Sequence, residues 1–175
     1  ISMQTLSGGF GWWPGSSDEY VWGSIYATDF LIEADRAGYP VPHMAQVGGL
    51  NYLEKVLSGK DSEYSLQEKS YAVYVLAKGG RIKASWIRRL QERMKDLPEY
   101  SRFHIAGALA IMGDRKTAEE ILAKGMSDNP IDMETDGSLN SYTRQQALAL
   151  TMYMDISPNS PFVPGLVKRL EENMK

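Results

Sequence analysis

Two acidic residues on one helical stretch are the first candidates for chemistry. Asp29 and Glu33 lie one helical turn apart in an otherwise apolar segment. Paired carboxyl groups are the usual machinery of glycoside hydrolysis, in which one donates a proton and the other acts as a base or nucleophile. The same spacing also suits an ion pair at a helix interface or a solvent-exposed position. We favour this structural interpretation and keep the acid pair as the alternative.

The other polar clusters fit catalysis less well. The acidic run at 132–136 lies in a loop flanked by proline and glycine, which is typical of a solvated turn rather than a metal site. His43 and His104 are far apart and show no metal-ligand spacing. The Asp-x-Asp-Asp cluster of one cyclase class is missing, and no serine lies in a nucleophile elbow. We therefore expect a chain that is not an enzyme by itself and that uses no cofactor.

A turn rich in glycine and tryptophan precedes the segment that carries the acid pair. Residues 7–15 read Ser-Gly-Gly-Phe-Gly-Trp-Trp-Pro-Gly. A phosphate-binding loop would need a strand before it and a helix directly after it. No strand pattern precedes this turn, and two bulky tryptophans stand where the backbone would have to approach a phosphate. A sugar-stacking platform could be built from the aromatic side chains Trp12, Trp13, Tyr20 and Trp22.

The structural interpretation of this turn is the one we prefer. Glycines supply positive φ angles, and aromatic side chains can hold a turn against neighbouring helices. We expect a structural turn motif with its aromatic side chains largely buried; its residues are Gln4, Gly8, Gly9, Phe10, Trp12 and Trp13.

Composition excludes several classes of function. The 175 residues carry 19 basic and 22 acidic side chains, a net charge of −3, so there is no basic surplus for nucleic acid. The apolar runs are too short to span a membrane, and we expect no membrane contact. The chain has no cysteine, which excludes disulfides, thiolate zinc sites and a cysteine nucleophile within it. The start at Ile1-Ser2-Met3 does not resemble a natural initiator, so we expect a fragment of a longer chain.

Helical periodicity runs through the whole chain and no segment shows strand alternation, which indicates an all-α fold. Serines before position 18 are candidate caps for the first helix, and Ser65 with Glu68 forms a capping box. The expected helices cover residues 18–37, 42–57, 66–78, 83–95, 98–112, 115–124, 141–154 and 163–174.

The third, fifth and seventh of these helices are apolar on most sides, and each is followed by a helix with one apolar stripe. Such alternation predicts antiparallel helical hairpins with an inner and an outer layer. Residues 108–124 resemble half of a tetratricopeptide repeat, but no second copy follows at a fixed period. We therefore expect an α/α toroid, partial or complete, as a single domain over 1–175, and keep a helical-repeat interaction module as an alternative.

The sequence from Gln4 to Pro42 resembles the thioester-domain region of bacterial alpha-2-macroglobulins. The resemblance rests on the Gln…Gly-Gly-Phe-x-Trp-Trp turn, on Tyr26-Ala-Thr-Asp-Phe-Leu31 in the helix, and on the Ala37-Gly-Tyr-Pro-Val-Pro42 junction. Beyond position 42 it concerns mainly the order of helices. The spacing of Gln4, Gly8 and Phe10 is also similar to a Gln-x-x-x-Gly-x-Trp motif of terpene cyclases, which share the toroid fold.

The resemblance implies one domain of a large periplasmic or cell-surface protein that entraps proteases. Its partners would be the other domains of the parent chain and, through the whole protein, target proteases. The family's thioester joins cysteine and glutamine in a Cys-x-Glu-Gln motif on an earlier helix, whereas this chain has no cysteine. Either the motif lies upstream of Ile1 or this member lacks it, so the resemblance implies a domain type and no active site.

Overall fold

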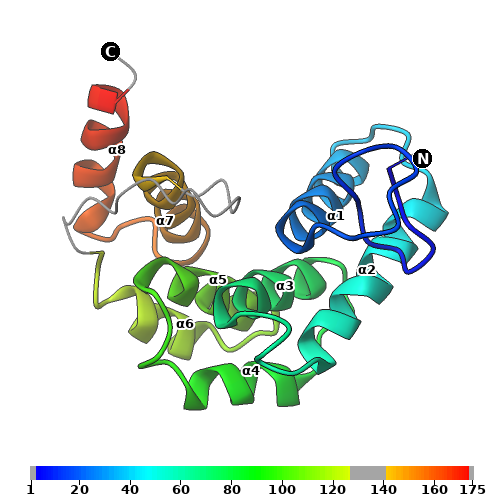
Figure 1. Cartoon of the computed structure of the whole chain (residues 1–175). Coiled ribbons are helices and arrows are strands. Elements are labelled where there is room, and N and C mark those ends of the chain that lie inside the picture. Colours follow the sequence, from blue (N-terminus) through cyan, green and yellow to red (C-terminus); the bar gives the residue numbers. More distant parts are fainter. Residues whose placement is uncertain (1–2, 127–140, 174–175) are drawn as a thin grey trace. The chain divides into compact units, whose positions relative to one another are not determined.

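The computed structural model describes residues 3–126 and 141–173, which form eight helices (Figure 1). In chain order they are α1 (Val21–Arg36), α2 (His43–Ser58), α3 (Leu66–Lys78), α4 (Ala84–Glu92), α5 (Glu99–Ile111), α6 (Arg115–Leu122), α7 (Tyr142–Ile156) and α8 (Phe162–Asn173). Within the described ranges the only β pairing is an isolated antiparallel bridge between Gln4 and Phe10. The all-α prediction is therefore confirmed for this part of the chain.

The chain divides into two compact units. Unit 1 spans Ile1–Met94 and contains α1 to α4, and unit 2 spans Lys95–Lys175 and contains α5 to α8. In unit 1, α1 packs against α2 and α3, and α4 packs against α3. In unit 2, α5 packs against α6 and α7, and α8 packs against α7. The single domain expected over residues 1–175 stays a prediction.

The first helix begins later than the sequence indicated. It starts at Val21 after Tyr20, with no side-chain cap and no acid in its first turn. The serine expected as a cap is used by the turn instead, because the Ser16 hydroxyl accepts a hydrogen bond from the Asp18 amide at 3.2 Å. Glu19 is likewise held by Ser7 and Thr5. The other helix starts agree well, with the capping box at Ser65 and a side-chain cap at Ser141 both present.

The expected alternation of buried and outer helices is present for α3 and α5 but not for α7, which buries one stripe only, formed by Gln145, Gln146, Ala149, Met152, Tyr153 and Ile156. α3 and α5 bury residues on most of their sides, whereas α4, α6 and α8 each bury only one to three. α5 and α7 meet through an edge-to-face pair between Phe103 and Tyr153, whose ring centroids are 6.1 Å apart. The Tyr153 hydroxyl donates to the Leu122 carbonyl at 2.7 Å, which ties α7 to the end of α6. Burial, with a smaller contribution from the charge of Glu99, raises the pKa of Tyr153 to about 12.

Small side chains bring α1 and α2 close together in unit 1. A methyl group at Gly49 would lie 2.4 Å from the Thr28 hydroxyl, so α2 touches α1 where it has no side chain. Thr28 and Ser24 are fully buried at this crossing, and each hydroxyl donates to the carbonyl one turn earlier. The close crossing places the start of α2 directly against the N-terminal turn.

Charged groups fasten the loop between α2 and α3. The ammonium group of Lys69 is buried and donates to the Gly59 carbonyl at 2.8 Å and to Asp61 at 2.6 Å. Arg93 binds the other carboxylate oxygen of Asp61. The hydrogen bond from Lys69 has the largest effect on the pKa of Asp61 and lowers it. Desolvation opposes it, but the charge of Lys69 and the hydrogen bond and charge of Arg93 also act downward, so the pKa of Asp61 is lowered. No described helix has the length and apolar character needed to cross a membrane.

Candidate functional site

The N-terminal turn is pinned to α2 by the side chain of Gln4. Its amide nitrogen donates to the Gly8 carbonyl and to the Ala45 carbonyl, both at 2.9 Å. Around it, the Thr5 amide donates to the Gly9 carbonyl at 2.9 Å, and the Gly11 amide donates to the Met3 carbonyl at 2.9 Å. One side chain therefore closes the turn and joins it to the first turn of the helix.

Glycine is required where the turn meets α2. Gly8 has φ +92°, and a methyl group there would lie 2.1 Å from the carbonyl oxygen of Gly48. A methyl group at Gly9 would lie 2.9 Å from the ring of Tyr52. Side chains are thus excluded at both positions, on one side by a helix backbone and on the other by a buried aromatic ring.

Phe10 connects the same turn to α1. Its ring is buried, with 9% of the residue exposed, and its amide donates to the Ser24 hydroxyl at 2.7 Å. Its carbonyl accepts from the Tyr20 amide at 2.8 Å, one residue before α1 begins. For Gln4, Gly8, Gly9 and Phe10 the geometry is that of a structural turn.

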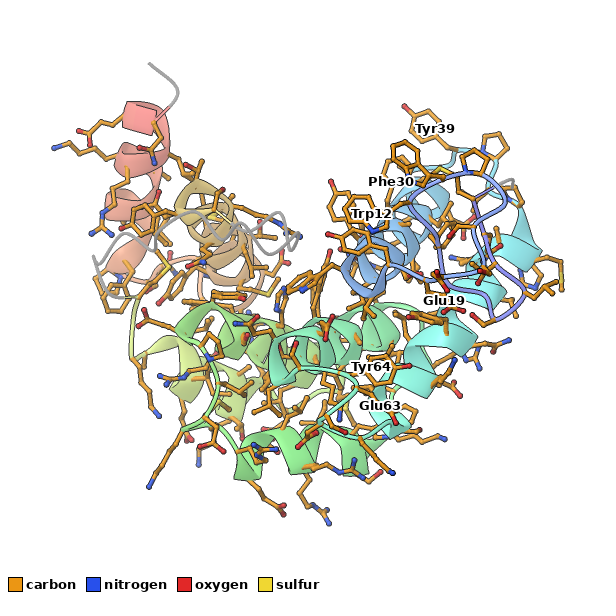
Figure 2. All side chains as sticks on the ribbon, viewed as in Figure 1. Trp12, Glu19, Phe30, Tyr39, Glu63 and Tyr64 are labelled. Atoms are coloured by element: carbon orange, nitrogen blue, oxygen red, sulfur yellow. The ribbon has the colours of Figure 1, made fainter. Side chains whose placement is uncertain are left out.

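The expected burial of both tryptophans is wrong. Trp12 is 53% exposed and Trp13 is 75% exposed. Because Phe10 points into the unit and Gly11 is buried against Ser16, the chain leaves the core before it reaches the tryptophans. Trp12 lies flat on Tyr20, with ring centroids 3.9 Å apart and an interplanar angle of 20°. Figure 2 shows Trp12 beside α1 at the surface of unit 1.

The acid pair belongs to an ion-pair cluster between α1 and α3. The ammonium group of Lys78, of which 7% of the side chain is exposed, binds both Asp29 and Glu33. The Tyr71 hydroxyl donates to Asp29 at 2.9 Å, and Arg36 binds Glu33 at 3.0 Å. Both carboxylates are therefore engaged by cations from the helices that they join.

The electrostatics of this cluster do not suit a general acid. Desolvation would raise the pKa of Glu33, but the hydrogen bond and charge of Lys78, with those of Arg36, outweigh it and lower that pKa. A glycosidase acid needs a raised pKa so that it holds a proton near neutral pH. No local pattern marks this outcome, since Lys78 is an ordinary lysine at the end of an apolar helix.

The other candidate residues are distributed over both units. His43 is exposed at the start of α2, and His104 is buried in α5 of the other unit. Nowhere in residues 3–126 and 141–173 do three or more histidine or acidic side chains gather to hold a metal ion. The acidic run at 132–136 falls outside the described residues. The described residues that line a pocket in unit 2 include no carboxylate; they are Met126, Tyr153, Phe162, Leu166 and Arg169.

We expect Gly8→Ala to lower the free energy of unfolding by about 3 kcal/mol. Alanine would have to adopt the left-handed conformation of Gly8, which costs about 1–2 kcal/mol, and its methyl group would overpack the contact with α2, which costs about 1–3 kcal/mol. Gly15→Ala is the matched control, since Gly15 also has a positive φ of +80° but open space around it. It should cost only the first of these two amounts. Urea unfolding of both variants measures the difference, and equal losses would refute the packing argument.

Phe10→Ala should cost about 3–5 kcal/mol, as expected for a buried aromatic side chain. Trp13→Ala should change stability by no more than about 0.5 kcal/mol, because the ring is mostly solvated. Trp12→Ala should fall between them at about 1 kcal/mol, the scale of one stacked pair. Chemical unfolding curves of the three variants give this order, and a Trp13→Ala loss as large as that of Phe10→Ala would contradict it.

Glu33→Gln should destabilise the chain near pH 7 by less than about 1 kcal/mol, because half of the side chain is exposed. The pKa of Glu33 in the folded chain lies below the unfolded value of 4.5, so its contribution is present above that pH and is lost as pH falls through the folded pKa. The difference from the unmodified chain should therefore shrink as the pH falls through the folded pKa of Glu33 and vanish below it. Glu120→Gln on exposed α6 serves as the control, and a pH-independent difference for Glu33→Gln would rule out the ion pair as its source.

Comparison with known proteins places these features in a family context. No family model matches the chain. An alpha-2-macroglobulin of Xylella fastidiosa is 31% identical over 163 residues, which cover 86% of this chain and 10% of that protein. The native conformation of Escherichia coli alpha-2-macroglobulin matches 98% of this chain and 12% of its own, with a TM-score of 0.83 and 27% identity. The form of that protein activated by porcine elastase matches 99% of this chain and 17% of its own, with a TM-score of 0.84 and 26% identity.

These matches run through nearly all of the chain, including the turn and both sets of helices. They agree with the helix content in assigning an all-α fold of the α/α toroid type, built from antiparallel hairpins. The chain spans about a tenth of the length of the curated relatives that it matches. It is homologous to one all-α segment of the bacterial alpha-2-macroglobulins.

Proposed function

We propose that residues 1–175 form a domain of a bacterial alpha-2-macroglobulin-like protein that entraps proteases, and that this domain is not catalytic by itself. The observation that carries the proposal is the combined match of sequence and fold along 98% of the chain to solved alpha-2-macroglobulin of Escherichia coli. The elastase-activated form of the same relative supports proteases as the targets. Other domains of the parent chain would then be the immediate partners.

The geometry of unit 1 supports a domain without chemistry of its own. Asp29 and Glu33 are both paired with Lys78, and the lowered pKa of Glu33 opposes a role as proton donor. This weakens the alternative of a carbohydrate-active or cyclase-like toroid enzyme. A thioester needs a cysteine thiol, and these residues contain none, so we do not assign covalent capture to this chain.

A plain helical-repeat interaction module is the second alternative. The match to alpha-2-macroglobulin of Escherichia coli over 98% of the chain supports the toroid domain over this alternative. The bacterial relatives further support a protein outside the cytoplasm, in the periplasm or on the cell surface.

The proposal predicts that protease inhibition depends on the whole parent protein and is not a property of this chain alone. The parent should inhibit trypsin or elastase, whereas the 175-residue chain should neither inhibit them nor form a covalent adduct. Substrate turnover and high-mass bands on a denaturing gel report the two properties, with methylamine-treated parent as the control for thioester chemistry. Inhibition by the isolated chain, or an inactive parent, would contradict the proposal.

A further inference from the structure

The loop between α2 and α3 presents a lysine to solvent. It spans residues 59–65, and Lys60, Asp61, Ser62 and Glu63 are exposed in it. Glu63 and the neighbouring Tyr64 are labelled in Figure 2. Exposed loop tips with polar residues are preferred sites of proteolytic cleavage. Because trypsin-like proteases cut after lysine or arginine, the bond between Lys60 and Asp61 is a target for them.

The carbonyl group of that bond is engaged within the loop. The Lys60 carbonyl accepts hydrogen bonds from the amides of Glu63 and Tyr64, both at 3.1 Å. The chain therefore makes a tight turn here, whereas recognition through main-chain hydrogen bonds requires an extended peptide. The loop has to open before a protease can bind it, and the rate of cleavage then follows the fraction of molecules in which the loop is open.

A buried lysine holds the turn on both sides of the bond. The Lys69 ammonium group donates to the Gly59 carbonyl at 2.8 Å and to the Asp61 carboxylate at 2.6 Å, so it joins the residues that flank Lys60. Only 4% of the Lys69 side chain is exposed, compared with 53% of that of Asp61. Opening the loop would remove the carboxylate from a buried ammonium group, and an unpaired buried charge is unfavourable.

Two further contacts close the same loop. Arg93, at the C-terminal end of α4, binds the other carboxylate oxygen of Asp61 although the two residues are 32 positions apart. The ring of Tyr64 lies against Gly59, where an added methyl group would be 2.4 Å from it. The loop is thus fastened to α3 through Lys69, to α4 through Arg93, and to itself through the tyrosine ring.

A protein that captures a protease is exposed to that protease for as long as it is held. The captured enzyme is present at a high effective concentration, so even a bond that opens rarely is at risk of cleavage. Ion pairs that lower the open fraction of an exposed lysine loop would protect the chain under these conditions.

We propose that Asp61, Lys69 and Arg93 form a clamp that protects the bond between Lys60 and Asp61 from trypsin-like proteases. The purpose of the clamp rests on the proposed function, because a parent protein that entraps proteases brings them close to this chain. The clamp itself lies wholly within unit 1 and is measured in the 175-residue chain without reference to inhibition.

Limited digestion with trypsin, followed by mass spectrometry of the fragments, tests the clamp. Asp61→Asn should speed cleavage after Lys60 by about tenfold, the change in open fraction expected from the loss of one charged hydrogen bond. A synthetic peptide of residues 57–66, in which Lys60 is the only basic residue, corrects for the preference of trypsin for asparagine or aspartate beside the cut. Asp18→Asn is the matched control, since Asp18 is exposed in another loop of unit 1.

Arg93→Gln weakens the clamp and leaves the sequence around the cut unchanged. It should speed the same cleavage by about threefold, less than Asp61→Asn does, because this ion pair is exposed. Cleavage at the lysines and arginines of unit 2 should keep its rate in both variants, since general unfolding would expose them as well.

Unchanged cleavage after Lys60 in either variant would overturn the clamp. So would an acceleration that the peptide reproduces, or one that extends equally to unit 2. Inhibition of trypsin or elastase by the parent protein is scored separately, so the clamp and the proposed function can fail independently.

Discussion

The backbone contact between Gly8 and Gly48 is the constraint on which the arrangement of the N-terminal region depends. It permits the turn to lie directly on α2, close enough for the Gln4 amide to reach the Ala45 carbonyl. Hydrogen bonds alone would not fix this position, because each contributes only about 1 kcal/mol net. The absence of side chains on both surfaces removes the steric barrier, and the hydrogen bonds then select one register of turn on helix.

That register decides which aromatic residues enter the core. Once Gly8 and Gly9 are fixed against α2 and Tyr52, the next residue points inward and the chain turns out at Gly11. Phe10 therefore becomes a core residue, whereas Trp12 and Trp13 remain exposed. Aromatic content in a turn indicates that the turn is important, but the backbone direction determines which ring is buried.

The sequence predicted the order and type of the helices well, because periodicity and caps act locally. The capping box at Ser65 and the alternation of inner and outer helices could both be read without a structure. Contacts between distant segments could not. The pairing of Asp29 with Lys78 spans 49 positions, and no local pattern marks it. The sequence does contain a signal for the helix that contacts the turn. Gly48 and Gly49 lie inside an apolar helix, where each glycine costs about 1 kcal/mol of helix stability relative to alanine, so their presence indicates close packing at that point.

The turn does not depend on its exposed tryptophan rings for stability. A solvated ring adds little to the folding free energy of its own unit, so the stability of unit 1 does not explain Trp13. The turn nevertheless fixes the backbone on either side of it, because the Phe10 amide donates to the Ser24 hydroxyl and the Ser16 amide donates to the Trp13 carbonyl at 3.1 Å. The backbone of the turn is thus ordered by hydrogen bonds that do not involve the ring of Trp13, so the exposure of this ring follows from the direction of the backbone.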